Sequence, residues 1–297
     1  MFFCVVAGLD FLADGPLLYA LAMTNQPISQ MSGWQPYFEP LIDDPTSVAL
    51  SARGLTKRFG ELVAVDRLTM DVPKGSIYGL VGPNGAGKTT AISMWTGLTR
   101  PDAGDVWLDG HDVWRDPQAA KASLGLLVDG LPVFDRLSGS ELLYYLGAIR
   151  GLEQETVKVR SGELLEALGL TDASDKRIVD YSAGMTKKIL LAAALLHNPA
   201  VLILDEPLEA VDPASGRIIQ QILRNYAASG GTVILSSHVM EIVEGLCDHV
   251  AIIGRGQVLT CGPTDSVRQN HSLTDVFINL VGGGQLGEGS LGWLGTK

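Results

Sequence analysis

Residues 82–90, with the sequence GPNGAGKTT, constrain the fold of this chain more than any other segment. An apolar run at 77–81 precedes them as a predicted strand, and residues 91–95 follow as a predicted helix. This order of strand, glycine-rich loop and helix is the context of a phosphate-binding P-loop. Glycines let successive N–H groups turn toward one anion, and the N-terminus of the helix adds its positive end. The segment therefore predicts a nucleotide-binding α/β fold.

The side chains of this loop have separate expected roles. Lys88 can reach terminal phosphate oxygens, and the Thr89 hydroxyl can ligate Mg²⁺. A plain glycine-rich turn is the alternative, but it does not account for a complete motif with lysine and threonine in place. The predicted nucleotide-binding residues of the loop are Gly82, Pro83, Asn84, Gly85, Ala86, Gly87, Lys88, Thr89 and Thr90.

The composition limits the classes of protein to which the chain can belong. It has 297 residues, 46% of them apolar, which is enough for one large or two modest domains with a sizeable core. The formal net charge of −11 argues against a nucleic-acid-binding surface, because such surfaces are basic. Three cysteines, Cys4, Cys247 and Cys261, are odd in number and lack a CxxC spacing, so neither a disulfide framework nor a zinc site is expected.

The two ends of the chain differ in composition from its middle. Residues 1–23 are apolar but carry Asp10, Asp14 and a Gly-Pro break, so they do not match a transmembrane helix. Residues 24–47 are rich in Pro, Ser, Gln and Asp, as linkers are. We expect residues 1–47 to be a disordered N-terminal extension, residues 48–280 to form the folded domain, and residues 281–297 to be a flexible tail.

Between these ends, predicted strands and helices alternate. Strands are expected at 62–65, 68–72, 106–110, 124–128, 201–204, 232–235, 250–253 and 258–260. Helices are expected at 142–149, 156–168, 186–196 and 215–228. The runs at 201–204 and 232–235 are apolar throughout, which is typical of strands buried in a parallel sheet. Residues 130–185 are predicted to be a mostly helical insert, and a capping box at Ser138 and Glu141 begins one of its helices.

Acidic residues follow one of the buried strands. Asp205 and Glu206 come directly after residues 201–204, and ligands bind at the carboxyl ends of strands in α/β sheets. Asp205 is placed to hold Mg²⁺ opposite Thr89, and Glu206 to orient or deprotonate an attacking water. An ordinary helix-capping acidic pair is the alternative. His238 ends the next buried strand and is a candidate for contacting a γ-phosphate or the attacking water.

These residues resemble the motifs of the ATP-binding-cassette (ABC) family of transporter ATPases, over about residues 48–280. Residues 82–90 resemble its Walker A, residues 201–206 its Walker B with the catalytic glutamate, residues 209–212 its D-loop and His238 its switch histidine.

Residues Ser182, Ala183, Gly184 and Met185 resemble the signature motif of the family.

Phe59 could stack on adenine or fill the core, and its position alone does not decide between these two roles. It falls where the family keeps an adenine-stacking aromatic, so the resemblance favours stacking.

The resemblance implies a P-loop NTPase cassette with a RecA-like parallel-sheet core, an N-terminal antiparallel β subdomain and an inserted α-helical subdomain. It implies ATP and Mg²⁺ as cofactors, with Glu206 and His238 as the catalytic residues. Two copies of the cassette would sandwich ATP between the Walker A of one and the signature motif of the other. A separate polytopic membrane permease would be the further partner, which implies a location at the cytoplasmic face of the membrane.

Several positions depart from the commonest pattern of the family. Its signature usually reads LSGGQ, whereas residues 181–185 read YSAGM, and versions ending in methionine resemble cassettes that serve ABC-2-type exporters. Asp129 stands where most members have glutamine, so it is a candidate ATP contact and Mg²⁺ ligand with a shorter reach. The loop at 131–137 is the expected docking site of the permease, with an ordinary surface loop as its alternative.

Two other functions are considered as alternatives. A cassette ATPase of translation or DNA repair would be expected to carry two cassettes or long coiled-coil insertions, and the acidic charge also disfavours it. A cassette that binds ATP without hydrolysing it is disfavoured by the presence of Lys88, Asp205, Glu206 and His238. The hypothesis carried forward is the ATPase subunit of an ABC-2-type exporter.

Overall fold

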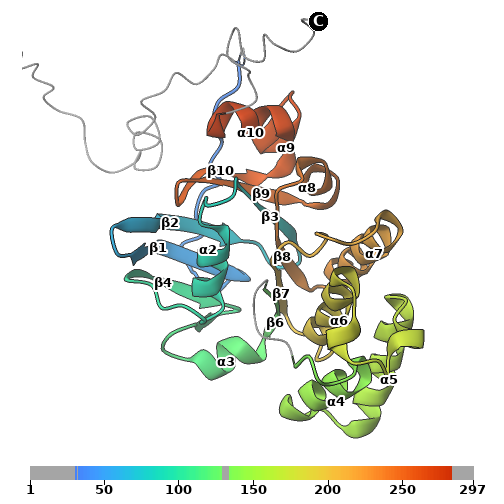
Figure 1. Cartoon of the computed structure of the whole chain (residues 1–297). Coiled ribbons are helices and arrows are strands. Elements are labelled where there is room, and N and C mark those ends of the chain that lie inside the picture. The colour runs from blue at the N-terminus through green and yellow to red at the C-terminus, as the bar shows by residue number, and fades with distance from the viewer. Residues whose placement is uncertain (1–30, 32, 129–133, 283–297) are drawn as a thin grey trace, which may run out of the picture.

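A computed structural model of the chain describes residues 31, 33–128 and 134–282. Within these residues two sheets lie beside each other, and α2 (Lys88–Trp95) packs on the antiparallel one (Figure 1). Their buried side chains form two apolar clusters. One joins the antiparallel sheet and α2 to one face of the core sheet, and the other joins the opposite face to the surrounding helices.

The smaller sheet is antiparallel, with the strand order β2-β1-β4-β5. Its strands are β1 (Leu50–Phe59), β2 (Leu62–Val72), β4 (Ala103–Leu108) and β5 (His111–Asp112). The two short strands expected at 62–65 and 68–72 are in fact one strand. Arg67 has a φ of 50° and the register with β1 shifts there, so the strand is bent rather than divided.

The core sheet has the strand order β10-β9-β3-β8-β7-β6. Its members are β3 (Ile77–Val81), β6 (Leu124–Leu127), β7 (Val201–Leu204), β8 (Thr232–Ser237), β9 (His249–Gly254) and β10 (Gln257–Pro263). All neighbours pair in parallel except β10, which is antiparallel to β9. The carboxyl ends of β3, β7 and β8 therefore meet at one edge, as the apolar pattern of these strands predicts.

Five of the described helices pack on the face of the core sheet opposite the antiparallel sheet: α6 (Ala183–Leu195), α7 (Pro213–Ala228), α8 (Met240–Leu246), α9 (Thr264–Arg268) and α10 (Leu273–Val281). The helix α3 (Pro117–Ala122) lies on the other face, where Ala120 joins the cluster of the antiparallel sheet and α2. The expected insert forms α4 (Gly139–Ile149) and α5 (Gln154–Ala167), with 3-10 turns at Thr171–Ala173 and Ile178–Asp180. It lies at the lower right of Figure 1, away from α9 and α10. The predicted capping box is confirmed, since the Ser138 hydroxyl accepts from the Glu141 N–H and the Glu141 carboxylate accepts from the Ser138 N–H.

Residues 33–47 were expected to belong to a disordered linker, and this expectation is wrong for them. The Trp34 ring is buried and its Nε1 donates to the Val267 carbonyl at 2.8 Å. Phe38 forms a parallel bridge with Cys261 of β10, and the Thr260 hydroxyl donates to the Tyr37 carbonyl. The aromatic residues account for the difference, because a polar, proline-rich segment with buried aromatic anchors gains apolar burial that a plain linker lacks.

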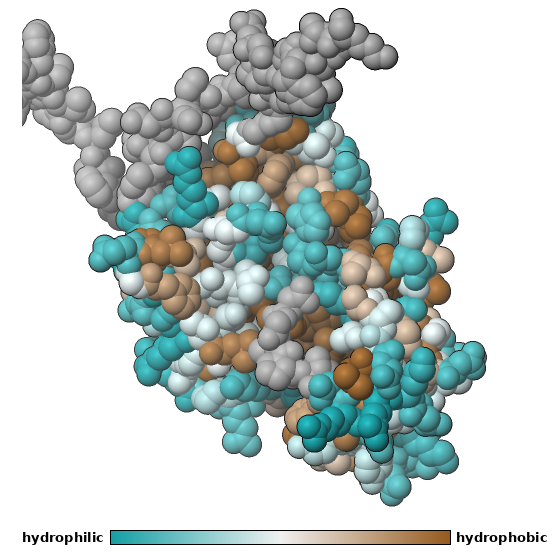
Figure 2. Space-filling view, viewed as in Figure 1, coloured by the Kyte–Doolittle hydropathy of each residue, from teal (hydrophilic) through white to brown (hydrophobic). Residues whose placement is uncertain are grey.

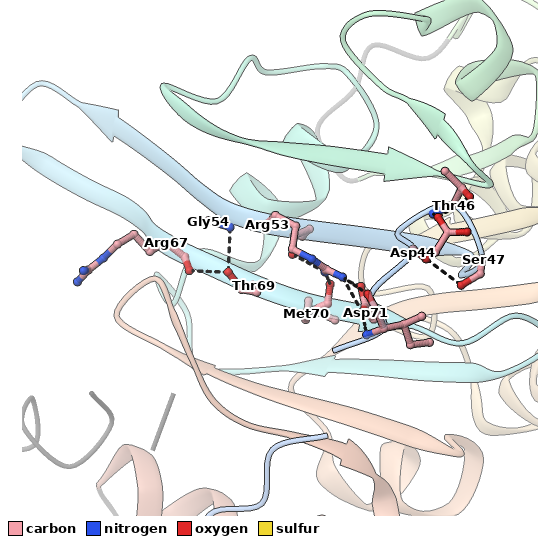
Figure 3. A network of polar contacts seen from close by, with 11 residues as sticks. Asp44, Thr46, Ser47, Arg53, Gly54, Arg67, Thr69, Met70 and Asp71 are labelled. Carbon is pink, nitrogen blue, oxygen red and sulfur yellow. Dashed lines mark hydrogen bonds and ion pairs between the residues drawn. The ribbon is translucent and has the colours of Figure 1, made fainter. Parts of the chain in front are cut away.

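The same segment is tied to the antiparallel sheet by a polar network, seen at close range in Figure 3. Arg53 and Asp71 form a two-pronged ion pair with N–O distances of 2.6 and 2.9 Å. Ile42 donates its N–H to Asp71 and accepts at its carbonyl from Arg53. Residues 33–47 therefore span both sheets, and the folded domain begins before residue 48.

The other expectations for the chain ends fall on residues 1–30 and 283–297, which lie outside the described residues. The final described element is α10, which ends at Val281. In the described part of the chain, no helix combines the length and the apolar character needed to cross a membrane.

Candidate functional site

The P-loop joins the end of β3 to the start of α2 and is held by close backbone approaches. Gly87 has a φ of 102°, and a Cβ added to it would lie 2.4 Å from the Ala64 carbonyl oxygen. A Cβ on Gly82 would lie 2.5 Å from the Ile253 carbonyl oxygen. Both positions therefore require glycine, one for its conformation and both for space. The loop is fixed between β2 and β9, which presets the curve of its N–H groups.

Lys88 lies inside that curve. Its ammonium donates to the Gly82 carbonyl at 2.6 Å and lies 3.9 Å from Glu206 Oε1. The side chain is largely buried, so its charge is held by the loop and by the carboxylate rather than by bulk water. A phosphate entering the loop would meet this cation beside the N-terminus of α2.

The side chain of Thr89, in α2, faces that of Asp205, which follows β7. The Thr89 hydroxyl donates to Asp205 Oδ2 at 2.9 Å, and the Ser236 hydroxyl donates to Oδ1 at 2.5 Å. Asp205 is 2% exposed, so both of its oxygens are satisfied by the protein in a nearly closed position. A threonine hydroxyl next to a carboxylate is the oxygen-donor set that Mg²⁺ accepts, with waters and phosphates completing its shell.

Glu206 and His238 meet at the same edge. His238 Nδ1 lies 3.0 Å from Glu206 Oε2, and since a carboxylate only accepts, the ring donates there. The Glu206 backbone has a φ of 48°, which is uncommon for a residue with a Cβ. This turn directs the carboxylate between His238 and Lys88 instead of along the strand. A small hollow of about 190 Å³ opens beside the two residues.

The signature residues begin α6. Ser182 is its N-cap, and the hydroxyl accepts from the Met185 N–H at 3.2 Å. Ser182 and Ala183 are exposed, whereas a Cβ added to Gly184 would lie 2.8 Å from the Ala210 carbonyl oxygen. The N-terminus of α6 is thus exposed at Ser182 and Ala183, while Gly184 packs on the segment after Glu206.

Phe59 lies at the end of β1 with its side chain exposed. Phe59 is 52% exposed, so it is not a core residue. The Lys57 ammonium lies over it, 5.7 Å from the ring centroid, and is itself held by Asp102 and the Arg100 carbonyl. Asp129 lies outside the described residues, so its expected contact with ATP and Mg²⁺ stays a prediction.

Sequence reasoning missed the part played by Ser236 and by Lys187, whose ammonium lies 3.4 Å from the Asp205 carbonyl oxygen. Ser236 was seen only as part of a strand end. The available signal was a polar residue at the end of an apolar strand, next to the strand that ends in Asp205.

Comparison with known proteins gives concordant results. The sequence pattern of the ABC transporter family matches residues 65–209. The linearmycin resistance ATP-binding protein LnrL of Bacillus subtilis is 37% identical, over 72% of this chain and 68% of its own length. The Nod factor export ATP-binding protein I of Ralstonia nicotianae is 38% identical, over 72% of this chain and 66% of its own length.

A solved structure of an ATP-binding subunit of an ABC transporter superposes with a TM-score of 0.74 at 25% identity, covering 78% of this chain and 99% of that one. This likeness confirms the predicted cassette fold. The chain therefore belongs to the ABC transporter family, as one of its ATP-binding and ATP-hydrolysing subunits.

Proposed function

We propose that this subunit powers an ABC-2-type exporter, with Glu206 as the general base of ATP hydrolysis and Lys88 as the principal cation on the phosphates. The observation that carries the proposal is the position of the Glu206 carboxylate, 3.0 Å from His238 Nδ1 and 3.9 Å from the Lys88 ammonium. A base oriented by one partner and set beside a phosphate-binding cation is the arrangement that this reaction needs.

In the proposed step a water oxygen bonds to the γ-phosphorus while the bond from that phosphorus to the β,γ-bridging oxygen breaks. Glu206 takes the proton of the water, and ADP departs with the electron pair of the broken bond. The nucleotide's Mg²⁺ would be held by Thr89 and Asp205, whose hydroxyl and carboxylate are already 2.9 Å apart. When bound, it neutralises phosphate charge. No cluster of three or more His, Cys, Asp or Glu side chains among the described residues offers a protein cage, which suits a cation that keeps waters and phosphates.

The proposal includes a second copy of the chain. The exposed N-terminus of α6 offers Ser182, Ala183 and Gly184 to a phosphate held by another subunit, as the resemblance implies. Phe59, exposed at the end of β1, supplies the surface on which adenine stacks. ATP then completes an interface that each chain presents only in part.

The membrane permease is proposed to dock on the helical insert. Phe134 is 52% exposed and packs edge-on against Tyr145 of α4, with ring centroids 5.3 Å apart. Tyr144 and Ile149 of the same helix are also exposed, so apolar surface is available beside the expected docking loop. On the face seen in Figure 2, hydrophobic and hydrophilic residues are mixed. Residues 131–133 of the loop lie outside the described residues.

The cargo class and the location are proposed with support from two relatives and from this proposed docking. Linearmycin resistance and Nod factor export are the processes named for two similar proteins, and both names suit outward transport. We therefore propose export of an antibiotic-like or Nod-factor-like molecule, with this subunit at the cytoplasmic face of the membrane. The cargo itself would be bound by the permease.

The base assignment is tested by comparing Glu206→Gln with Glu163→Gln, the same change at an exposed glutamate of α5. Glu206→Gln should retain ATP binding while turnover falls by roughly 10²- to 10⁴-fold, the usual contribution of a general base. Glu163→Gln should keep parental turnover. Parental turnover in Glu206→Gln would overturn the assignment.

The docking proposal has a separate test. Phe134→Asp should abolish co-purification with the permease while ATP binding to the isolated chain is unchanged, and Leu62→Asp on the exposed end of β2 should not. Retained co-purification of Phe134→Asp would contradict this docking site.

A further inference from the structure

We propose that Ser236 is a positioning residue, whose hydroxyl sets the direction of both candidate carboxylates without contacting the nucleotide. The inference rests on the proposed roles of Asp205 and Glu206. It concerns a residue that none of the family motifs quoted above includes.

The first observation is the pair of hydrogen bonds that this hydroxyl makes. Ser236 is completely buried near the end of β8. Its Oγ donates to Asp205 Oδ1 at 2.5 Å and accepts from the Glu206 N–H at 2.9 Å. A serine hydroxyl has one proton to donate, and here that proton is committed to Asp205. One side chain therefore joins the side chain of one acidic residue to the backbone of the next.

Strand register explains why Ser236 occupies this position. In the parallel pair β7–β8, Leu204 is opposite Leu235, so the residues that follow them, Asp205 and Ser236, come within hydrogen-bond distance. Asp205 is also held from the other side, because its Oδ2 accepts from Thr89 of α2. The carboxylate is thus fixed at both oxygens, and it cannot rotate without breaking a buried hydrogen bond.

The second observation is the backbone of Glu206. A φ of 48° is unfavourable for a residue with a Cβ and persists only where neighbouring groups hold it. The Ser236 Oγ holds the N–H of that same residue. Through this turn the Glu206 side chain reaches His238 and Lys88. Loss of the hydroxyl would free the turn and leave the partly buried Glu206 N–H and a buried Asp205 oxygen each short of one partner.

The test compares Ser236→Ala, Ser236→Thr and the neighbouring control Ser237→Ala. Ser237 is also in β8, but its hydroxyl accepts only locally, from Val239 N at 3.1 Å. For each variant one measures kcat and KM for ATP, the Mg²⁺ concentration that gives half-maximal turnover, and ATP binding without a divalent cation. Hydrogen exchange of the peptide spanning residues 204–207 is followed in the nucleotide-free protein.

For Ser236→Ala we expect kcat to fall roughly 10- to 100-fold, the effect of one lost hydrogen bond to a charged group. Its KM and its cation-free ATP binding should change little, the Mg²⁺ requirement should rise severalfold, and exchange at residues 204–207 should accelerate. Ser236→Thr restores the hydroxyl and should recover most of the turnover, even if its extra methyl group lowers the unfolding temperature. Ser237→Ala should match the parent throughout.

Two results would overturn the inference while leaving the proposed function intact. In one, Glu206→Gln is inactive but Ser236→Ala behaves like Ser237→Ala. In the other, Ser236→Ala loses stability, ATP affinity and turnover together and threonine does not rescue turnover, which would identify a packing role. Parental turnover in Glu206→Gln would instead overturn the proposed base and, with it, this inference.

Discussion

The P-loop edge of the core sheet and the N-terminus of α6 are both expected to hold phosphate, yet the chain supports them differently. At the P-loop edge, Lys88 and Asp205 are buried and bonded to neighbours from three different elements. At α6, Ser182 and Ala183 are exposed, and the Ser182 hydroxyl caps its own helix. The first site is preorganised within one chain, whereas the second is an open surface.

This difference separates two kinds of variant. Changes at the P-loop edge should alter what one isolated chain does with ATP. Changes at the start of α6 should leave the isolated chain's ATP affinity intact and act only where two chains meet. The predictions below use that separation, beginning with the largest expected effect.

Lys88→Ala should weaken ATP binding to the isolated chain by roughly 10- to 100-fold, since it removes a charged hydrogen-bond donor to phosphate. It would also leave Glu206 without the cation that lies 3.9 Å away. Titration calorimetry of the purified chain measures the affinity, and Lys74→Ala, at an exposed lysine, is the control. An unchanged ATP affinity would show that the P-loop lysine does not bind the phosphates. The contrast between the P-loop edge and the N-terminus of α6 would then fail.

Gly184→Ala should lower turnover roughly 10-fold, or about 1.4 kcal/mol, because the added methyl group meets the Ala210 carbonyl at 2.8 Å. ATP affinity of the isolated chain should stay within error. Gly162→Ala on α5 makes the same change where the space is open, and its turnover should be parental. If Gly184→Ala weakened ATP binding to a single chain, residues 182–185 would contribute to the ATP site of their own chain rather than to that of a second chain.

A further expected effect, on stability rather than on turnover, concerns His197, which follows the end of α6. His197 Nε2 lies 3.0 Å from the Leu124 carbonyl, and burial, followed by the nearby charges of Arg150 and Arg160, lowers its pKa from 6.5 to about 4. A histidine with a lowered pKa in the folded chain is protonated preferentially in the unfolded chain. The free energy of unfolding should therefore begin to fall as the pH drops below 6.5, and this contribution should be lost by about pH 4.

Urea unfolding at several pH values measures this dependence. His197→Asn should flatten the curve between these pH values. Equal slopes in the parent and in His197→Asn would show that other groups govern the acid sensitivity.

Much of the architecture was predictable because its signals are local. The P-loop sequence, the all-apolar runs at β7 and β8, and the capping box at Ser138 each depend on residues close together in the chain. The order of the motifs then indicated the family, and the fold and family are confirmed by the comparisons.

The missed features depend on contacts between distant residues. Trp34 is buried because it packs near Val267, more than two hundred residues away in the chain. No sequence pattern within residues 33–47 predicts this contact. Ser236 matters because strand register puts it beside Asp205, which a reading of β8 alone does not reveal. Tertiary packing determines the positions of both residues, and local composition does not predict them.

The central claim is that ATP completes an interface between two chains, and the molecular mass of Glu206→Gln in solution tests it most directly. Without ATP, light scattering after size exclusion should give the 31.6 kDa mass of one chain. With saturating ATP and Mg²⁺ it should give twice that mass, and a second change, Ser182→Arg, should return it to one chain while ATP stays bound. A single-chain mass for Glu206→Gln with ATP demonstrably bound would contradict the account.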